Sequence, residues 1–252
     1  MIANADLTSL VVFICVFGGA LLGMRLSRLL PEEHLESSSK DIVRGGMAVV
    51  ATMVALVLGL LVASAKSYFD TQSNEITQLA SDVVLLDRML AHLGPQAVPT
   101  RVMLKDDVTR IVDTVWGSSS EKNPGVPRAV SAEPLYDSLE QVHATTDEER
   151  TVKAQALSLM VELGRLRWLM YAQRQTHVPG ILLVLLIVWL TLTSMSSGLF
   201  ARPNATVIAS FFAAALSVAS AVWLIMEMYT PYTGFLHVPD GAVRAALAQL
   251  GT

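Results

Sequence analysis

Four long stretches of this sequence carry no charged side chain, and they constrain the fold more than any other feature. They cover residues 7–24, 45–65, 178–201 and 203–226. Each is close to the roughly 20 residues that a helix needs to cross the hydrocarbon core of a bilayer. Lipid offers no partner for backbone N–H and C=O groups, so such stretches are expected to be helical.

The composition supports a membrane protein over a large soluble domain. The chain has 252 residues, of which 52% are hydrophobic and 16% charged, whereas soluble domains carry about 25% charged residues. Four buried helices of a soluble domain would need polar segments to cover them, and too few residues remain for that. We therefore predict an all-α membrane protein with four transmembrane helices.

The spans are grouped two and two around a polar insert. Residues 1–65 hold the first pair and residues 66–178 the insert. Residues 179–230 hold the second pair, and 231–252 form a short tail with an amphipathic helix after Asp240. The opening MIANADL has no Lys or Arg and is not typical of a signal peptide, so we expect the first span to be retained.

The helix of the second span is expected to continue into the insert, because no Pro or Gly follows Gly59 until Gly94. Apolar residues then recur in steps of three and four, the pattern of a coiled-coil seam. They are Ile76, Leu79, Val83, Leu86, Leu90 and Leu93. Polar residues are expected to fill the other faces, among them Asp70, Gln72, Glu75, Asp82, Asp87 and Arg88.

Further helices are expected at Thr100–Trp116 and Leu135–His143, followed by a long return helix. Thr146 and Glu149 have the spacing of a capping box at its start. Its seam consists of Val152, Ala156, Leu159, Leu163, Leu166 and Met170. The two seams could pair within one chain or between chains. We favour both, in a homo-oligomer with a coiled-coil-like insert.

Small residues on two spans indicate surfaces where membrane helices pack closely. The first span has Gly19 and Gly23 four residues apart. The second has a stripe with the same spacing, made of Ala51, Ala55, Gly59 and Ala63.

Polar residues near the span ends are candidates for a pore or pore mouth, because rings of such side chains select ions in many channels. They are Ser64, Lys66, Ser67, Asp70, Glu75 and Glu227. A simpler interpretation is open for five of them. Lys66 and Asp70 have the spacing of a helical ion pair, the serines could bond backbone carbonyls, and Glu227 could mark where the fourth span meets water.

Nothing in the sequence is typical of an enzyme. The five histidines are scattered, without the four-residue spacing that binds a metal on a helix. We therefore expect no catalysis, cofactor or metal. The net charge of −4 does not favour nucleic-acid binding. The one cysteine, Cys15, lies within the first span.

The short links between spans carry most of the basic residues that orient membrane proteins. Arg25, Arg28, Lys40 and Arg44 lie in the first link and Arg202 in the second. Because basic links stay in the cytoplasm, this count places the insert and both termini outside it.

Several runs of the sequence closely resemble the bestrophin-like domain family of bacterial membrane proteins. They are LPEEHLESSSKDIVRGGMAVVATMVALVLGLLVASAKSYFDTQSNEITQLASDVVLLDRMLAHLGP in the first half and LYDSL, GRLRWLM, SGLFARPNATVIASFFAAALSVASAVWLIME and PYTGF in the second. The family name implies a relation to bestrophins, which are pentameric anion channels with four membrane helices and a helical domain between the second and third.

The resemblance implies an oligomeric ion channel in a bacterial cell membrane, with the second span nearest the pore axis. Three features depart from bestrophins. The second span has no aromatic residue, the long acidic calcium-binding tail of animal bestrophins is not found, and bestrophins keep their insert in the cytosol. The ion is left open, since the family name implies anions while Asp70 and Glu75 favour cations. The alternative is a non-conducting scaffold or sensor that acts through the helical insert.

Overall fold

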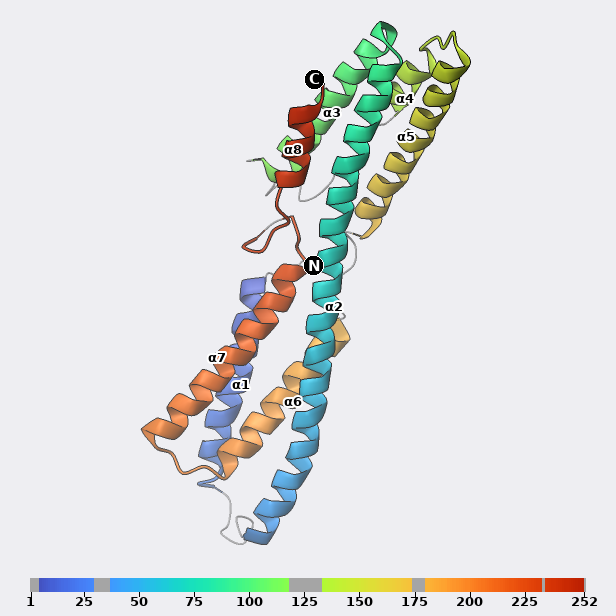
Figure 1. Ribbon diagram of the computed structural model, residues 1–252. Coiled ribbons are helices and arrows are strands. Elements are labelled where there is room, and N and C mark those ends of the chain that lie inside the picture. Colours follow the sequence, from blue (N-terminus) through green and yellow to red (C-terminus); the bar gives the residue numbers. More distant parts are fainter. Residues whose placement is uncertain (1–4, 30–36, 118–132, 174–179, 233, 252) are drawn as a thin grey trace. The chain divides into compact units, whose positions relative to one another are not determined.

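A computed structural model of the chain describes residues 5–29, 37–117, 133–173, 180–232 and 234–251. Within these ranges the protein is helical and has no strand (Figure 1). The helices are α1 (Ala5–Leu26), α2 (Ser37–His92), α3 (Val98–Trp116), α4 (Glu133–Glu140), α5 (Asp147–Gln173), α6 (Gly180–Leu199), α7 (Ala205–Met228) and α8 (Gly241–Gln249), with a 3-10 turn at Pro95–Ala97.

The helices divide into two compact units. Unit 1 comprises residues 1–67 and 177–229, and unit 2 comprises residues 68–176 and 230–252. Among the described residues, four helices are long and apolar enough to cross a membrane, namely α1, α2, α6 and α7. The predicted boundary between residues 178 and 179 lies outside the described ranges.

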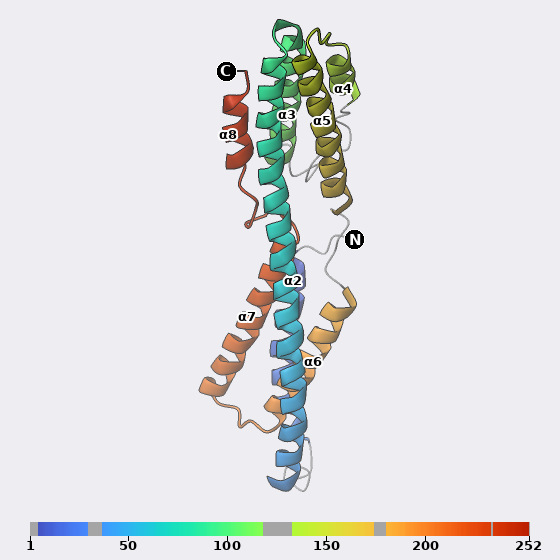
Figure 2. The same ribbon diagram turned by 45° about the vertical axis from the view of Figure 1, so that its right-hand side comes forward.

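Unit 1 is organised around α1, which packs against both α6 and α7 (Figure 1). In the view of Figure 2, α2 lies in front of α1, and α6 and α7 are seen on either side. Aromatic rings fill part of the contact with α7. The ring of Phe212 lies edge-on to those of Phe13 and Phe17, with centroids 5.4 and 5.7 Å away. Near the start of α1, the indole of Trp223 donates a hydrogen bond of 3.0 Å to the Asp6 carboxylate.

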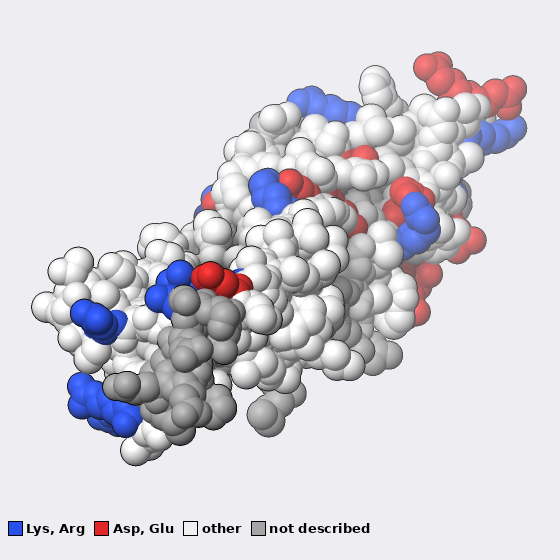
Figure 3. All heavy atoms as spheres, turned by 90° about the horizontal axis from the view of Figure 1, so that it is seen from below, with Lys and Arg blue, Asp and Glu red and all other residues white. Residues whose placement is uncertain are grey.

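One end of unit 1 is basic. There α1 ends, α2 begins and the short link joins α6 to α7 (Figure 1). Figure 3 looks onto this end and shows basic side chains with acidic atoms beside them. Arg25, Arg28, Arg44 and Arg202 are exposed here, as is the acidic Asp41.

Unit 2 contains an apolar core shared by the second part of α2 with α3, α4, α5 and α8. All six residues of the predicted α2 seam, from Ile76 to Leu93, are buried in it. On α5, the seam residues Ala156, Leu163, Leu166 and Met170 are buried, and Val152 and Leu159 pack against the core. Whether the seams form a coiled coil stays a prediction.

Helix α2 continues beyond its apolar stretch to His92, as the sequence predicted. The chain turns two residues after the end of α2, at Gly94, whose φ of 81° lies in the region that glycine adopts readily. It begins at Ser37, earlier than the predicted Gly45, because the polar residues before Gly45 include no helix breaker. Helix α4 begins at Glu133 and ends at Glu140, rather than covering Leu135–His143.

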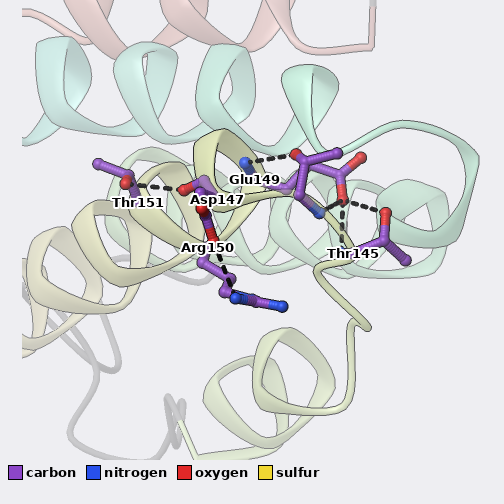
Figure 4. Close-up of polar contacts among 6 residues, drawn as sticks. Thr145, Asp147, Glu149, Arg150 and Thr151 are labelled. Atoms are coloured by element: carbon purple, nitrogen blue, oxygen red, sulfur yellow. Dashed lines mark hydrogen bonds and ion pairs between the residues drawn. The ribbon is translucent and has the colours of Figure 1, made fainter.

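The predicted capping box of α5 is confirmed. The Glu149 backbone N–H donates to the Thr146 hydroxyl at 3.1 Å, and the Thr146 N–H donates to the Glu149 carboxylate at 3.2 Å. The same carboxylate also accepts from the Thr145 N–H at 2.7 Å and the Thr145 hydroxyl at 2.8 Å (Figure 4). These bonds occupy N–H groups that have no partner within the helix.

Candidate functional site: a buried polar network and the span ends

The candidate pore residues are divided between the two units. Ser64, Lys66 and Ser67 are exposed at the end of the unit 1 part of α2, and the Ser64 hydroxyl lies 3.1 Å from the Tyr229 hydroxyl after α7. Glu227 is buried near the end of α7. Asp70 and Glu75 belong to unit 2, with Asp70 partly exposed.

Glu75 lies in a buried network of polar side chains. Gln173, the last residue of α5, donates its amide N–H to Glu75 Oε1 at 2.9 Å. Gln72 donates to Glu75 Oε2 at 3.3 Å and also to the Gln173 side-chain oxygen. Tyr232, in the segment after α7, donates its hydroxyl to Gln72 Oε1 at 2.7 Å. The network thus joins α2, the end of α5 and the start of the tail.

Because the network is buried, the loss of any one of its hydrogen bonds is expected to destabilise unit 2. The Gln72 side chain is fully buried and Glu75 is 8% exposed, so losing a partner would leave a polar group without water to replace it. Burial raises the pKa of Glu75, and the hydrogen bond from Gln173 opposes that rise. The Tyr68 hydroxyl also donates to the Gln173 backbone oxygen at 3.3 Å.

The network corrects one sequence prediction. Gln72, Glu75 and Asp87 were expected on the polar faces of α2, but all three are buried. For Gln72 a signal was present in the sequence, because it lies four residues before Ile76 and so extends the apolar seam with a polar side chain. Gln173 and Tyr232 are 101 and 160 residues away from Gln72, and no local pattern connects them.

Asp87 forms the most buried ion pair that the structure describes. Its carboxylate accepts two hydrogen bonds of 2.8 Å from Arg101 of α3, with 2% of the Asp87 side chain exposed against 19% for Arg101. The Gly251 N–H lies 3.4 Å from the same carboxylate, and Lys105 donates to the Leu250 carbonyl at 3.3 Å. Burial alone would raise the pKa of Asp87, but the bonds from Arg101 and Gly251 hold that pKa below its ordinary value.

A small cavity of about 50 Å³ lies in the core of unit 2. Its walls are apolar except for Asp107 of α3 and Arg167 of α5. Asp107 also pairs with Arg110 at 3.1 Å. Burial raises the pKa of Asp107 and lowers that of Arg167. The volume suits a few water molecules and is well below the roughly 300 Å³ of a typical ligand pocket.

The two sets of small residues have different surroundings. Gly19 and Gly23 face α6 so closely that a Cβ on Gly23 would lie 2.1 Å from the Met195 carbonyl oxygen. Gly198 of α6 approaches α1 in the same way, with a Cβ position 2.2 Å from the Ala20 carbonyl oxygen. By contrast, Ala51, Ala55, Gly59 and Ala63 of α2 are all exposed.

In the described part of the chain, no three His, Cys, Asp or Glu side chains lie close enough together to hold a metal ion.

Comparison with known proteins adds one finding. The family model described as "Bestrophin-like domain" matches residues 14–243, nearly the whole chain. No curated protein and no solved structure matches the chain significantly.

Proposed function

The chain belongs to the bestrophin-like domain family, and from that premise we propose that it is an oligomeric ion channel of a bacterial cell membrane rather than an enzyme. Four long apolar helices are consistent with such a location. The second span, within α2, lies nearest the pore axis in this proposal.

One observation supports the proposal independently of the family match. The small-residue stripe from Ala51 to Ala63 is exposed on α2, and an added Cβ on Gly59 would meet nothing within 4 Å. Small residues let membrane helices approach each other closely, since packing rather than the hydrophobic effect drives their association in lipid. Because the described residues leave this surface uncovered, it favours contact with the α2 helices of other copies.

In such an oligomer Ser64, Lys66 and Ser67 would repeat as rings where the second span ends. All three are exposed in the single chain. Rings of charged side chains set the ion preference of many channels, so the Lys66 rings would favour anions there. Asp70, one turn later, would oppose that preference.

Recording from the purified protein in planar bilayers tests this proposal. We expect currents, and we expect Lys66→Glu to shift the reversal potential in a salt gradient towards cation selectivity. The matched control is Arg150→Glu, which makes the same charge change at an exposed site on α5. Absence of current under every pH, voltage and ion condition, or a monomer by mass measurement in detergent, would contradict the proposal.

The alternative is a non-conducting scaffold or sensor, and one observation favours it. Helix α5 has large apolar side chains on its exposed face, with Val161, Trp168 and Leu169 outside the core. Such side chains suit contact with another protein. An oligomer with a continuous water-filled axial path lined by the second span would exclude this alternative.

A further inference from the structure

An open groove of about 530 Å³ lies in unit 2, where the link after α4 meets the first turns of α5. One wall is a single face of α5, because Arg150, Lys153, Ala154 and Leu157 fall at positions i, i+3, i+4 and i+7. Residues 142–145 of the link form the rest. The volume is within the roughly 300–1,000 Å³ of small-molecule sites.

The charge in this groove has one sign. Among the described residues, its lining includes three basic side chains and no carboxylate. The basic side chains are those of His143, Arg150 and Lys153. The carboxylate of nearby Glu149 is engaged in the capping box, and in the view of Figure 4 the Arg150 guanidinium points away from it. The groove is therefore suited to an anion.

The two cations on α5 are held in different ways. Lys153 donates from Nζ to the carbonyls of Glu140 and Val142, at 2.7 and 2.8 Å. An ammonium has three N–H donors, so these bonds fix the charge at the groove and leave the third N–H for a ligand. Arg150 pairs with Asp147 at 2.9 Å, but the two side chains are 64% and 96% exposed. Such a pair contributes little, so an anion can replace Asp147.

Apolar surface adjoins these charges. The groove is also lined by Ala154 and Leu157 of α5 and by Val142 and Ala144 of the link. Val142 belongs to the buried core of unit 2, and Leu157 packs against that core. A purely polar ion would leave this surface in water, whereas a ligand with an apolar group would cover it and gain free energy by doing so.

We propose that this groove binds a small organic oxyanion, which is a carboxylate or a phosphate ester that carries a short apolar group. Arg150 and Lys153 hold the oxyanion, since a guanidinium donates two parallel hydrogen bonds to such a group and an ammonium adds another. The apolar group covers Ala154 and Leu157. This binding is additional to the proposed function and does not depend on conduction.

Isothermal titration calorimetry of the full chain in an uncharged detergent tests the inference, with phenyl phosphate, benzoate and inorganic phosphate as probes. We expect at least one aromatic probe to bind once per chain, and inorganic phosphate to bind more weakly than phenyl phosphate. Arg150→Gln should raise the Kd about tenfold, because a hydrogen bond to a charged group contributes at least that much. Ala154→Phe keeps both charges but fills the groove, and should abolish binding.

The matched control is Arg165→Gln. It breaks an exposed ion pair of the same i, i+3 spacing on the same helix, outside the groove, and should leave the Kd unchanged. Residues 150, 154 and 165 are exposed, so we expect all three variants to fold, which circular dichroism checks.

Absence of binding by both aromatic probes at millimolar concentration would overturn the inference. Binding that neither Arg150→Gln nor Ala154→Phe weakens would place the ligand elsewhere and also overturn it. Equal Kd values for inorganic phosphate and phenyl phosphate would show that the apolar surface takes no part, and equal losses in Arg150→Gln and Arg165→Gln would show a general charge effect. Either result contradicts the proposed site.

Discussion

Two hydrogen bonds from Arg101 and one from the Gly251 backbone converge on the Asp87 carboxylate, which is almost completely withdrawn from water. Arg101→Ala would leave that charge buried without its main partner, and breaking such a pair costs roughly 3 kcal/mol. We expect unfolding of unit 2 in detergent to become easier by about that amount, measured by denaturant titration followed by circular dichroism.

The control for this prediction is Arg165→Ala. Arg165 pairs with Glu162 at 2.7 Å, but the two side chains are 75% and 44% exposed, and exposed pairs contribute little to stability because water screens them. Equal effects of the two substitutions would show that burial does not set the contribution of the Asp87 pair.

Glu75 should make the stability of unit 2 depend on pH, in a direction that follows from its raised pKa. Because burial raises the pKa of Glu75 in the folded state, the folded protein binds its proton more tightly than the unfolded protein does. The free energy of unfolding should therefore rise as pH falls through the raised value, and the gain is complete below the ordinary value. Asp87, whose pKa is lowered, acts oppositely and loses its contribution only at lower pH.

Glu75→Gln separates these two contributions. The amide is neutral at all pH values, but its NH2 group replaces one of the two carboxylate oxygens that accept from Gln173 and Gln72. The variant therefore loses one hydrogen bond of the network at every pH, and its stability relative to the parent should fall further as pH falls and Glu75 of the parent is protonated. Unfolding curves of both proteins at several pH values measure the difference. A difference that does not change with pH would show that Glu75 is not the group that titrates.

The sequence alone identified Glu75 as a candidate functional residue, but it could not identify the hydrogen-bond partners of Glu75. It lies within a charged stretch after a span, which suggested a pore mouth, and its hydrogen-bond partner Gln173 enters from another helix. Periodicity identifies which face of a helix is apolar, whereas a network formed across 98 residues depends on tertiary contacts that no local pattern contains.

At the scale of elements, the α1–α6 contact relies on backbones that touch. Gly23→Ala would place a Cβ against the Met195 carbonyl, so the helices must separate. We expect destabilisation of roughly 1–3 kcal/mol, seen as a lower temperature of thermal aggregation in detergent. Gly18→Ala, on the same helix with open space around its Cβ position, should leave that temperature unchanged or slightly higher. A loss of the same size at Gly18 would point to backbone effects instead of the contact.

The start of α5 allows a second test at this scale. Thr146→Ala removes the hydroxyl that accepts from the Glu149 N–H, and loss of such a cap costs about 1 kcal/mol. Thr151→Ala, five residues along the same helix, removes only a bond to the Asp147 carbonyl (Figure 4) and should be close to neutral. Denaturant unfolding of both variants compares them, and similar losses would contradict the capping role.

The helices were the part of this structure that the sequence predicted best. The uncharged stretches, the breaker at Gly94 and the Thr146–Glu149 spacing are local, and each has its expected counterpart in α1, α2, α5, α6 and α7. The early start of α2 at Ser37 was missed because polar helical residues resemble polar link residues when no breaker separates them.

At the scale of the whole molecule, the basic residues of the two short links between spans predict that the insert lies outside the cytoplasm. Basic links are retained in the cytoplasm, so single cysteines at Pro203 and Glu148, in a Cys15→Ala background, should be modified from opposite sides. We expect Glu148→Cys to react with an impermeant maleimide added outside intact cells, and Pro203→Cys to react only after lysis. Reaction of Glu148→Cys only after lysis would instead give the orientation of bestrophins.

Unit 2 is built from two separate parts of the chain, residues 68–176 and 230–252. Tyr232 completes the hydrogen bonds of Gln72, and Gly251 adds to those of Asp87. Both residues lie beyond α7, so the ribosome makes them only after it has made all four apolar helices. The polar interior of unit 2 must therefore wait for the second pair of spans during synthesis.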